Sequence, residues 1–228
     1  MRWMALAISA IGLCSVSRAA EMDKTNERLD DAAELFNEIM GSPDKSIPQD
    51  LLNKSACIVL VPGLKKGGFV VAAKYGRGFV TCRNTSGQGW GAPAAVRIEG
   101  GSVGLQIGIS STDLVLLVMN ERGMKKLLSS KFTLGADASI AGGPVGRTAS
   151  AQTDVLITAE ILSWSRSRGA FAGVSLDGAT LRQDIDENEH MYGKRWDNRQ
   201  ILNSGAQPPP SAAKLIAALN KYSARKSG

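Results

Sequence analysis

Residues 114–119 read Leu-Val-Leu-Leu-Val-Met, an apolar run with no polar side chain. A strand with one solvated face alternates apolar and polar residues, so this run predicts a strand covered on both faces. The charged segment Glu121–Leu128 follows it and predicts a helix on the surface of the same sheet. The run therefore places a buried sheet at the centre of the fold.

Two earlier segments predict neighbouring strands. Cys57–Val61 reads Cys-Ile-Val-Leu-Val, a buried-strand pattern that follows a short helical turn at Ile47-Pro48. Val103–Ile109 alternates apolar residues with glycine and glutamine at a period of two, which predicts a further strand. Glycine punctuates the chain between these segments, as expected for successive strands joined by turns.

Ala151–Arg168 predicts a long strand, although its first half also fits a helix. The alternation of serine and arginine, followed by Gly169, favours the strand. One face would carry Val155, Ile157, Ala159, Ile161, Ser163, Ser165 and Ser167; the other would carry Thr158, Glu160, Leu162, Trp164, Arg166 and Arg168. Phe171–Leu176 would be its hairpin partner.

Helices are predicted at both ends of the chain. Ala20–Met40 is amphipathic and stops at Gly41-Ser42-Pro43; its apolar stripe comprises Leu29, Ala33, Leu35, Phe36, Ile39 and Met40. Seven acidic against two basic residues make this helix net negative. Asp184 and Glu187 resemble a capping box that opens a short helix closed by Gly193.

The C-terminal segment 204–228 combines a stiff Pro208–Pro210 spacer with a last helix capped by Ser211. The apolar side of that helix is formed by Leu215, Ile216, Leu219 and Tyr222. The predicted fold is α+β: a single domain over residues 20–203 with a glycine-rich, mainly antiparallel twisted sheet, either open or barrel-like, between N- and C-terminal helices.

Residues 1–19 resemble an export signal. Arg2 precedes an apolar stretch from Met4 to Val16, and small residues before position 20 predict cleavage after Ala19. Cleavage would remove two cations, Arg2 and Arg18, and lower the formal net charge from +6 to +4. We expect the mature protein in the periplasm or cell envelope, where a disulfide is permitted. The apolar surroundings of Cys57 and Cys82 nevertheless favour two buried free thiols.

Several ordered segments resemble the SYLF (Ysc84-like) family, and the resemblance runs from about Leu29 to Gly193. They are Gly89-Trp-Gly-Ala-Pro93, Gly100-Gly-Ser-Val-Gly-Leu-Gln-Ile-Gly108, Ser111-Thr-Asp-Leu-Val115, Lys131-Phe-Thr-Leu-Gly-Ala-Asp-Ala-Ser139, Ala141-Gly-Gly-Pro-Val-Gly146 and Ser165-Arg-Ser-Arg-Gly-Ala-Phe-Ala-Gly-Val-Ser-Leu-Asp-Gly178. The resemblance implies a lipid-binding domain in an exported bacterial member. Some eukaryotic members bind phosphoinositides partly through an amphipathic N-terminal helix. The acidic helix here departs from that pattern, so we expect it to pack on the core.

Basic residues are the candidates for contact with anionic phospholipid. Lys65 and Lys66 lie in a glycine-rich loop, Lys74 and Arg77 flank the next turn, and Arg166 and Arg168 share a strand face with Trp164. Arginine binds phosphate oxygens bidentately, and tryptophan favours the interface between hydrocarbon and water. Trp164 or Phe69 would insert into the membrane. The alternatives are an ion pair of Arg166 and Arg168 with Glu160 or Asp184, and a structural role for Trp164.

Residues for catalysis, metal or a cofactor are scarce. His190 is the only histidine and sits among carboxylates, and two distant cysteines with one histidine do not make a metal site. Gly142–Thr148 lacks the spacing and the lysine of a phosphate loop. Scattered aspartates such as Asp137 are typical of turns. We predict no enzyme, no cofactor and no metal.

Two functional classes follow. The first is a lipid-binding protein that docks on an anionic membrane through the basic residues, or carries lipid in a cavity of the sheet. The second is a non-catalytic structural or protein-interaction module that binds a partner through Gln207–Gly228. Nucleic acid is not expected, because export, low aromatic content and the lack of a basic run all argue against it.

Overall fold

The computed structural model describes residues 4–42, 46–68, 71–84, 88–103, 108–145, 158–167, 170–171, 176 and 178–223. Within these residues nine strands form one sheet in the order β5-β9-β3-β2-β1-β4-β7-β6, with β8 paired to β7. The strands are β1 Cys57–Gly68, β2 Val71–Cys82, β3 Ala94–Val103, β4 Gly108–Val118, β5 Lys131–Thr133, β6 Ile140–Gly142, β7 Ile161–Ser167, β8 Ala170–Phe171 and β9 Thr180–Gln183. Only β6 and β7 pair in parallel, so the predicted mainly antiparallel sheet is confirmed.

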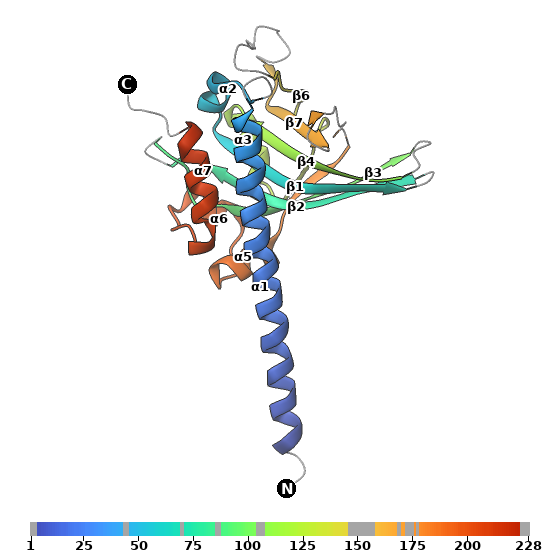
Figure 1. Cartoon of the computed structure of the whole chain (residues 1–228), viewed down its shortest axis with the longest axis vertical. Coiled ribbons are helices and arrows are strands. Elements are labelled where there is room, and N and C mark those ends of the chain that lie inside the picture. Colours follow the sequence, from blue (N-terminus) through green and yellow to red (C-terminus); the bar gives the residue numbers. More distant parts are fainter. Residues whose placement is uncertain are drawn as a thin grey trace.

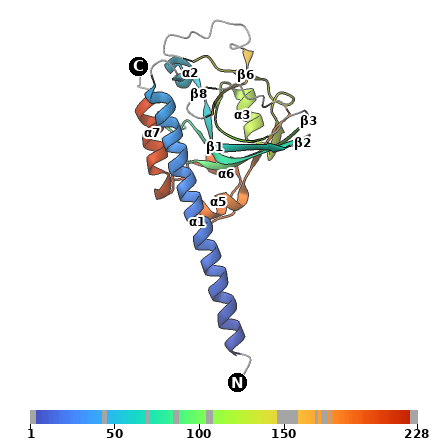
Figure 2. The same cartoon turned by 45° about the vertical axis from the view of Figure 1, so that its right-hand side comes forward.

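The sheet curls strongly, because its two edge strands are neighbours in the chain. β5 and β6 stand at opposite ends of an eight-strand path, yet only residues 134–139 separate them. Eight flat strands about 4.8 Å apart would hold their edges about 34 Å apart. The connection can span at most about 25 Å. The predicted barrel-like curvature is therefore confirmed as a half-barrel, and the strands bend out of a plane in Figure 2.

Buried side chains cover both faces of the sheet. Along β4, Val115 and Leu117 join the core beneath the helices, whereas Leu114, Leu116 and Val118 join a second core on the other face. All five side chains are fully buried. This alternation explains why residues 114–119 contain no polar side chain, and it confirms the prediction of a strand covered on both faces.

The helices are α1 Met4–Gly41, α2 Gln49–Lys54, α3 Glu121–Leu127, α5 Ile185–Tyr192, α6 Asn198–Asn203 and α7 Ala213–Ser223, with a 3₁₀ turn η1 at Pro210–Ala212. In Figure 1, α1 crosses one side of the sheet with α7 beside it. The predicted apolar stripe of α1 is buried from Leu29 to Met40, and the helix ends at Gly41 as expected. No helix among the described residues is long and apolar enough to cross a membrane.

The C-terminal helix belongs to the core and is not a separate segment after residue 203. Leu215 and Leu219 of α7 are completely buried, and they lie in the same cluster as Phe36 of α1. The proline spacer leads into η1, whose Ala212 is also buried. The expected division between a domain and a docking arm therefore has no counterpart in the packing.

Two predicted strands have different boundaries. For the strand predicted over Val103–Ile109, residues 104–107 lie outside the described residues; Val103 ends β3, which pairs with β2, and Gly108 begins β4, which pairs with β1. The strand predicted over Ala151–Arg168 begins only at Ile161, and residues 151–157 lie outside the described residues. From Ile161 onward the predicted alternation holds, with Leu162 and Trp164 in the core beneath α1.

The capping box predicted for α5 is only half formed. The Asp184 side chain accepts a hydrogen bond from Glu187 N at 3.4 Å, and Gly193 ends the helix at a positive φ of 66°. The Glu187 carboxylate, however, binds Arg28 and Arg77 instead of completing a capping box. A reciprocal capping box occurs instead in α6, between Asp197 and Gln200.

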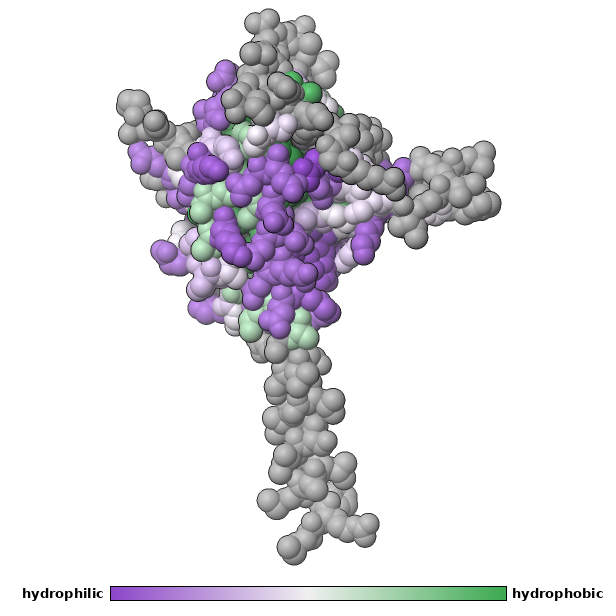
Figure 3. All heavy atoms as spheres, in the orientation of Figure 1, coloured by the Kyte–Doolittle hydropathy of each residue, from purple (hydrophilic) through white to green (hydrophobic). Residues whose placement is uncertain are grey.

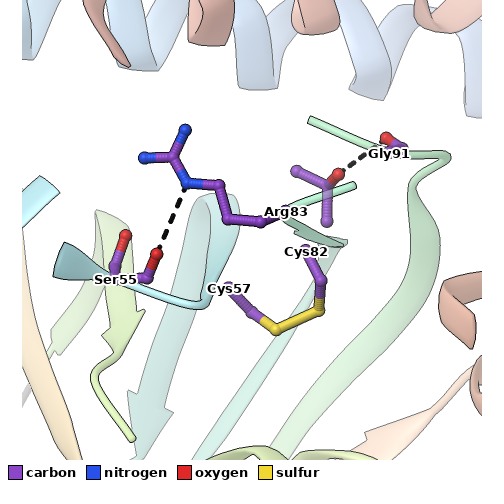
Figure 4. The surroundings of a disulfide bond; sticks show 6 residues. Ser55, Cys57, Cys82, Arg83 and Gly91 are labelled. Atoms are coloured by element: carbon purple, nitrogen blue, oxygen red, sulfur yellow. Dashed lines mark hydrogen bonds between the residues drawn. A yellow bond between two sulfur atoms is a disulfide. The ribbon is translucent and has the colours of Figure 1, made fainter. Parts of the chain in front are cut away.

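Cys57 and Cys82 form a disulfide between β1 and β2, so the expectation of free thiols is wrong (Figure 4). They are directly opposed in the strand register, which brings their side chains to the same face. Arg83 follows Cys82; its Nε donates to Ser55 O at 3.4 Å, and its guanidinium lies 3.9 Å from the Trp90 ring centre. The hydrogen bond to Ser55 ties the open, disulfide-linked end of the hairpin to the C-terminal cap of α2.

Candidate functional site

A groove of about 560 Å³ separates α1 from the sheet and contains three of the predicted residues, Lys65, Arg77 and Arg166. Its helical wall carries acidic side chains, among them Asp31 and Glu38. In Figure 3, hydrophilic side chains cover the side of the molecule that α1 crosses. The acidic face of α1 thus lies opposite basic residues that the sequence predicts to contact a membrane.

Arg77 lies inside β2, not beside a turn, and is held by buried carboxylates. Its Nε is 3.2 Å from Asp184 Oδ2, and its Nη1 is 3.3 Å from Glu187 Oε2. Burial lowers the pKa of the Arg77 guanidinium, but Asp184, Tyr75 and Glu187 together outweigh burial and leave that pKa above its ordinary value. Arg77 therefore holds α5 against the sheet through two ion pairs.

Arg166 is also neutralised within the fold. It pairs with Glu38 of α1, and its Nη2 is 3.4 Å from Asp113 Oδ2, the residue opposite it on β4. Burial lowers the pKa of Arg166, but the two carboxylates outweigh burial and raise it overall. The alternative of a structural ion pair is therefore the correct one, although its partners are neither Glu160 nor Asp184.

Two further predicted contacts are buried. Trp164 is 2% exposed, and its Nε1 donates to Pro144 O at 2.8 Å, so in this fold its ring cannot insert into a membrane. Lys74 lies inside β2 and is 6% exposed. Both side chains support the structure of the sheet, which is the structural alternative considered for Trp164.

Lys65 and Lys66 remain as solvent-accessible cations near the far end of β1. Lys65 is exposed and Lys66 is half-buried, and neither forms an ion pair within the part of the chain that the structure describes. They lie opposite Tyr75 and Lys74 on β2, and Tyr75 is itself 46% exposed. Arg168 and Phe69 lie outside the described residues.

A second groove, of about 230 Å³, contains four cations that the sequence did not single out: Arg97, Lys131, Arg182 and Arg195. These cations are spread over nearly a hundred residues of sequence, and no motif joins them. Strand register brings three of them together, because Arg97 pairs with Arg182 and Arg182 pairs with Lys131. Only the pairing of β3, β9 and β5 could have revealed them.

Catalytic and metal-binding arrangements are not apparent in the described part of the chain. No group of three or more His, Cys, Asp or Glu side chains there is placed to hold a metal ion. Asp137 has the turn role expected of it: it accepts a hydrogen bond from Thr133 N at 2.7 Å, and that bond lowers its pKa. The absence of enzymatic activity stays a prediction.

Comparison with known proteins gives one consistent family. A profile described as "Ysc84: Las17-binding protein actin regulator" matches residues 99–222, just over half of the chain. SH3 domain-containing YSC84-like protein 1 of Homo sapiens is 32% identical over 190 residues, which cover 82% of this chain and 55% of that protein. LAS seventeen-binding protein 3 of Saccharomyces cerevisiae is 31% identical over 186 residues, covering 80% and 40% respectively. Protein YSC84 of the same species is 29% identical over 186 residues, covering 80% and 39%. The chain thus spans about 40–55% of the length of these relatives.

Proposed function

The chain belongs to the Ysc84 (SYLF) family, and from that premise we propose that it is a non-catalytic binding protein that docks on anionic phospholipid headgroups. The docking surface in this proposal is the far end of the β1–β2 hairpin, with Lys65 and Lys66 as the headgroup contacts. Phe69, which follows this end of β1 in the sequence, would enter the hydrocarbon. Relatives of the chain carry the names of binding proteins, and these names support a binding role.

The observation that carries this proposal is the difference in charge compensation among the predicted residues. Arg77 and Arg166 each contact two carboxylates of the same chain, so their charge is already balanced. Lys65 and Lys66 have no such partner among the described residues. An anionic membrane would therefore attract Lys65 and Lys66 more strongly than Arg77 and Arg166.

The compensation also limits how strong such docking can be. Each basic residue near an anionic surface contributes about 1 kcal/mol. Two lysines therefore give about 2 kcal/mol, instead of about 6 kcal/mol for the six cations expected from the sequence. Burying a phenylalanine adds about 1.5–3 kcal/mol. We expect weak, salt-sensitive binding that needs both the lysines and Phe69.

Vesicle co-sedimentation tests this surface. Lys65→Gln/Lys66→Gln should weaken binding to vesicles of phosphatidylglycerol by about thirtyfold, which is the loss of about 2 kcal/mol. Phe69→Ser should weaken it further. The matched control is Lys125→Gln/Lys126→Gln, which removes two exposed lysines from α3 and should have a much smaller effect. Equal loss in the two double variants, or no binding by the unaltered chain, would reject the hairpin surface.

A lipid carrier is the other form of the lipid hypothesis. The inner face of the sheet is packed with its own side chains, among them Val59, Leu116 and Ile98. This packing favours surface docking over carriage in the described part of the chain. Binding that survives high salt and both lysine substitutions would instead indicate a buried acyl chain, because salt screens exposed charges far more than a buried ligand.

Export to the periplasm or cell envelope is the second part of the proposal. The signal-like residues 1–19 support it, as does the Cys57–Cys82 disulfide, since such bonds persist mainly in oxidising compartments. N-terminal sequencing of the protein recovered from envelope and cytosolic fractions tests it. A mature chain that begins at Ala20 outside the cytosol is the expected result, and an unprocessed chain confined to the cytosol would contradict it.

A protein-interaction module is the second candidate, favoured by the names of the relatives. The predicted docking arm Gln207–Gly228 no longer suits this role, because its described part packs into the core. A groove between α1 and α7 suits it better, since small side chains such as Ala33 and Ala217 line it. Ala217→Arg should then abolish recovery of a partner while vesicle binding stays unchanged, and recovery at the level of the unaltered chain would reject this groove.

A further inference from the structure

Four cationic side chains form one row across four adjacent strands. Arg77 on β2 is opposite Arg97 on β3, Arg97 is opposite Arg182 on β9, and Arg182 is opposite Lys131 on β5. Directly opposed residues in antiparallel strands point to the same face at a spacing of about 5 Å. Like charges placed in this way repel one another, so a sheet retains such a row only where anions compensate it.

The protein's own carboxylates compensate this row unevenly. Arg77 contacts Asp184 and Glu187, which are almost completely buried. Arg97 is 2.9 Å from Glu99 and 3.9 Å from Asp184. Toward β9 and β5, the cations of the row have fewer carboxylate partners.

Arg182 shares Glu99 with Arg97, at 3.1 Å, and its side chain is 41% exposed. Lys131, at the β5 edge, is exposed and has no ion pair among the described residues. Positive charge without a partner therefore accumulates at the outer end of the row.

A groove of about 230 Å³ opens at this outer end. Arg97, Arg182 and Lys131 line it together with Arg195, which extends from the chain after α5 and contacts Asp186 and Glu189. Ser130 and Gln183 add neutral polar groups to the lining, Ile185 adds an apolar one, and Asp186 adds a carboxylate that is already paired with Arg195. The groove is large enough for a small polar group and is bordered by guanidinium forks, which match phosphate oxygens bidentately.

We propose that this groove binds a single phosphate monoester group, with Lys131 and Arg182 as its principal contacts and Arg97 and Arg195 beside them. A doubly charged, tetrahedral anion would supply the charge that the outer half of the row lacks. This site is independent of the proposed membrane contact: it lies at the β9–β5 edge of the sheet, whereas Lys65 and Lys66 lie on β1, three strands away from β9 in the sheet order.

Isothermal titration calorimetry of the full chain with inorganic phosphate and with glycerol 3-phosphate tests the site. Saturable binding with one site per chain is expected, and it should weaken at least tenfold in Lys131→Gln/Arg182→Gln. The matched control, Arg122→Gln/Lys125→Gln, removes one arginine and one lysine from exposed positions of α3 and should change affinity less than twofold. Circular dichroism establishes that each variant is folded, and Arg195→Gln provides a second, milder substitution that should weaken binding severalfold.

Vesicles distinguish the source of the phosphate. If Lys131→Gln/Arg182→Gln loses binding to vesicles of phosphatidic acid, whose headgroup is a monoester, the ligand is a lipid. If this variant loses binding only to the soluble phosphates, the ligand is a small metabolite. Either of these two results supports the site. Two results would overturn the proposal: no saturable phosphate binding, or equal weakening in the pocket variant and the α3 control. Lys65→Gln/Lys66→Gln should leave phosphate binding intact, so failure of the membrane proposal remains distinguishable.

Discussion

Gly143 shows how a single atom restricts the choice of residue beneath a buried ring. A Cβ on Gly143 would lie 2.1 Å from Cζ2 of Trp164, far inside van der Waals contact. The adjacent Gly142 has no atom within 4 Å of the same position. Gly142 and Gly143 therefore have different structural importance, although they look equivalent in the sequence.

Gly143→Ala should lower the free energy of unfolding by about 1–3 kcal/mol, the usual cost of forcing extra volume into a packed core. Gly142→Ala is the matched control and should change it by less than about 1 kcal/mol. Urea denaturation followed by tryptophan fluorescence measures both. Equal destabilisation by the two substitutions would show that the Trp164 contact is not the cause.

Asp31 provides a pH-dependent prediction at the same scale. Burial raises its pKa, and the neighbouring carboxylates Glu27 and Glu34 raise it further. A carboxylate whose pKa is raised by folding destabilises the folded state above that pKa, and the penalty disappears as the pH falls below its ordinary value.

Asp31→Asn should therefore stabilise the protein at neutral pH by a few tenths of a kcal/mol, a small effect because solvent screens this side chain. The gain should shrink towards acid pH and in high salt. Thermal unfolding of the unaltered protein and of the variant, from about pH 3 to about pH 7, measures this difference in stability. A variant that is less stable at neutral pH would contradict the raised pKa.

At the scale of elements, the β1–β2 hairpin is held at one end by a covalent bond. Cys57 and Cys82 are opposite each other and are separated by 25 residues in the sequence. A disulfide that closes a loop of this size restricts the unfolded chain and typically stabilises a domain by about 2–4 kcal/mol.

Cys57→Ala/Cys82→Ala should lower the free energy of unfolding by about that amount, 2–4 kcal/mol. Reductant should destabilise the unaltered chain similarly and should leave the double variant unchanged. Denaturant titrations with and without dithiothreitol give all four values. If reductant does not affect the unaltered chain, the two cysteines are not bonded in solution.

At the scale of the whole molecule, the two ends of the chain close one face of the sheet together. α7 packs beside α1, and Lys214 pairs with Asp30 across their surface. Arg83 bonds Ser223 at the end of α7, and Trp90 Nε1 donates to Ser223 O at 3.1 Å. The last helix is thus held by both apolar burial and hydrogen bonds.

Deletion of Gln207–Gly228 should therefore destabilise the fold by more than about 4 kcal/mol, because it exposes the partners of Leu215 and Leu219. Leu219→Ala alone should lower the free energy of unfolding by about 2–5 kcal/mol. Lys214→Ala removes only a surface ion pair and should change it by less than about 1 kcal/mol. Urea denaturation compares the three variants. A truncated chain of undiminished stability would show that Gln207–Gly228 is a separate arm and not part of the core.

Local sequence patterns specify which segments are buried and what conformation most of them adopt. The run Leu114–Met119, the stripe from Leu29 to Met40 and the cap at Asp184 were all predictable, because burial and capping impose local patterns on neighbouring residues. The family resemblance was equally readable, since it consists of ordered local segments.

Which charges are available to a ligand depends on the three-dimensional packing of the chain. Arg77 and Arg166 look like solvated cations in the sequence, yet Glu187 and Glu38, more than a hundred residues away, neutralise them. Arg97, Arg182 and Lys131 look unrelated until strand register aligns them. The physical reason is that hydrophobic periodicity acts over a few residues, whereas electrostatic pairing depends on distances in space that strand order and helix packing set.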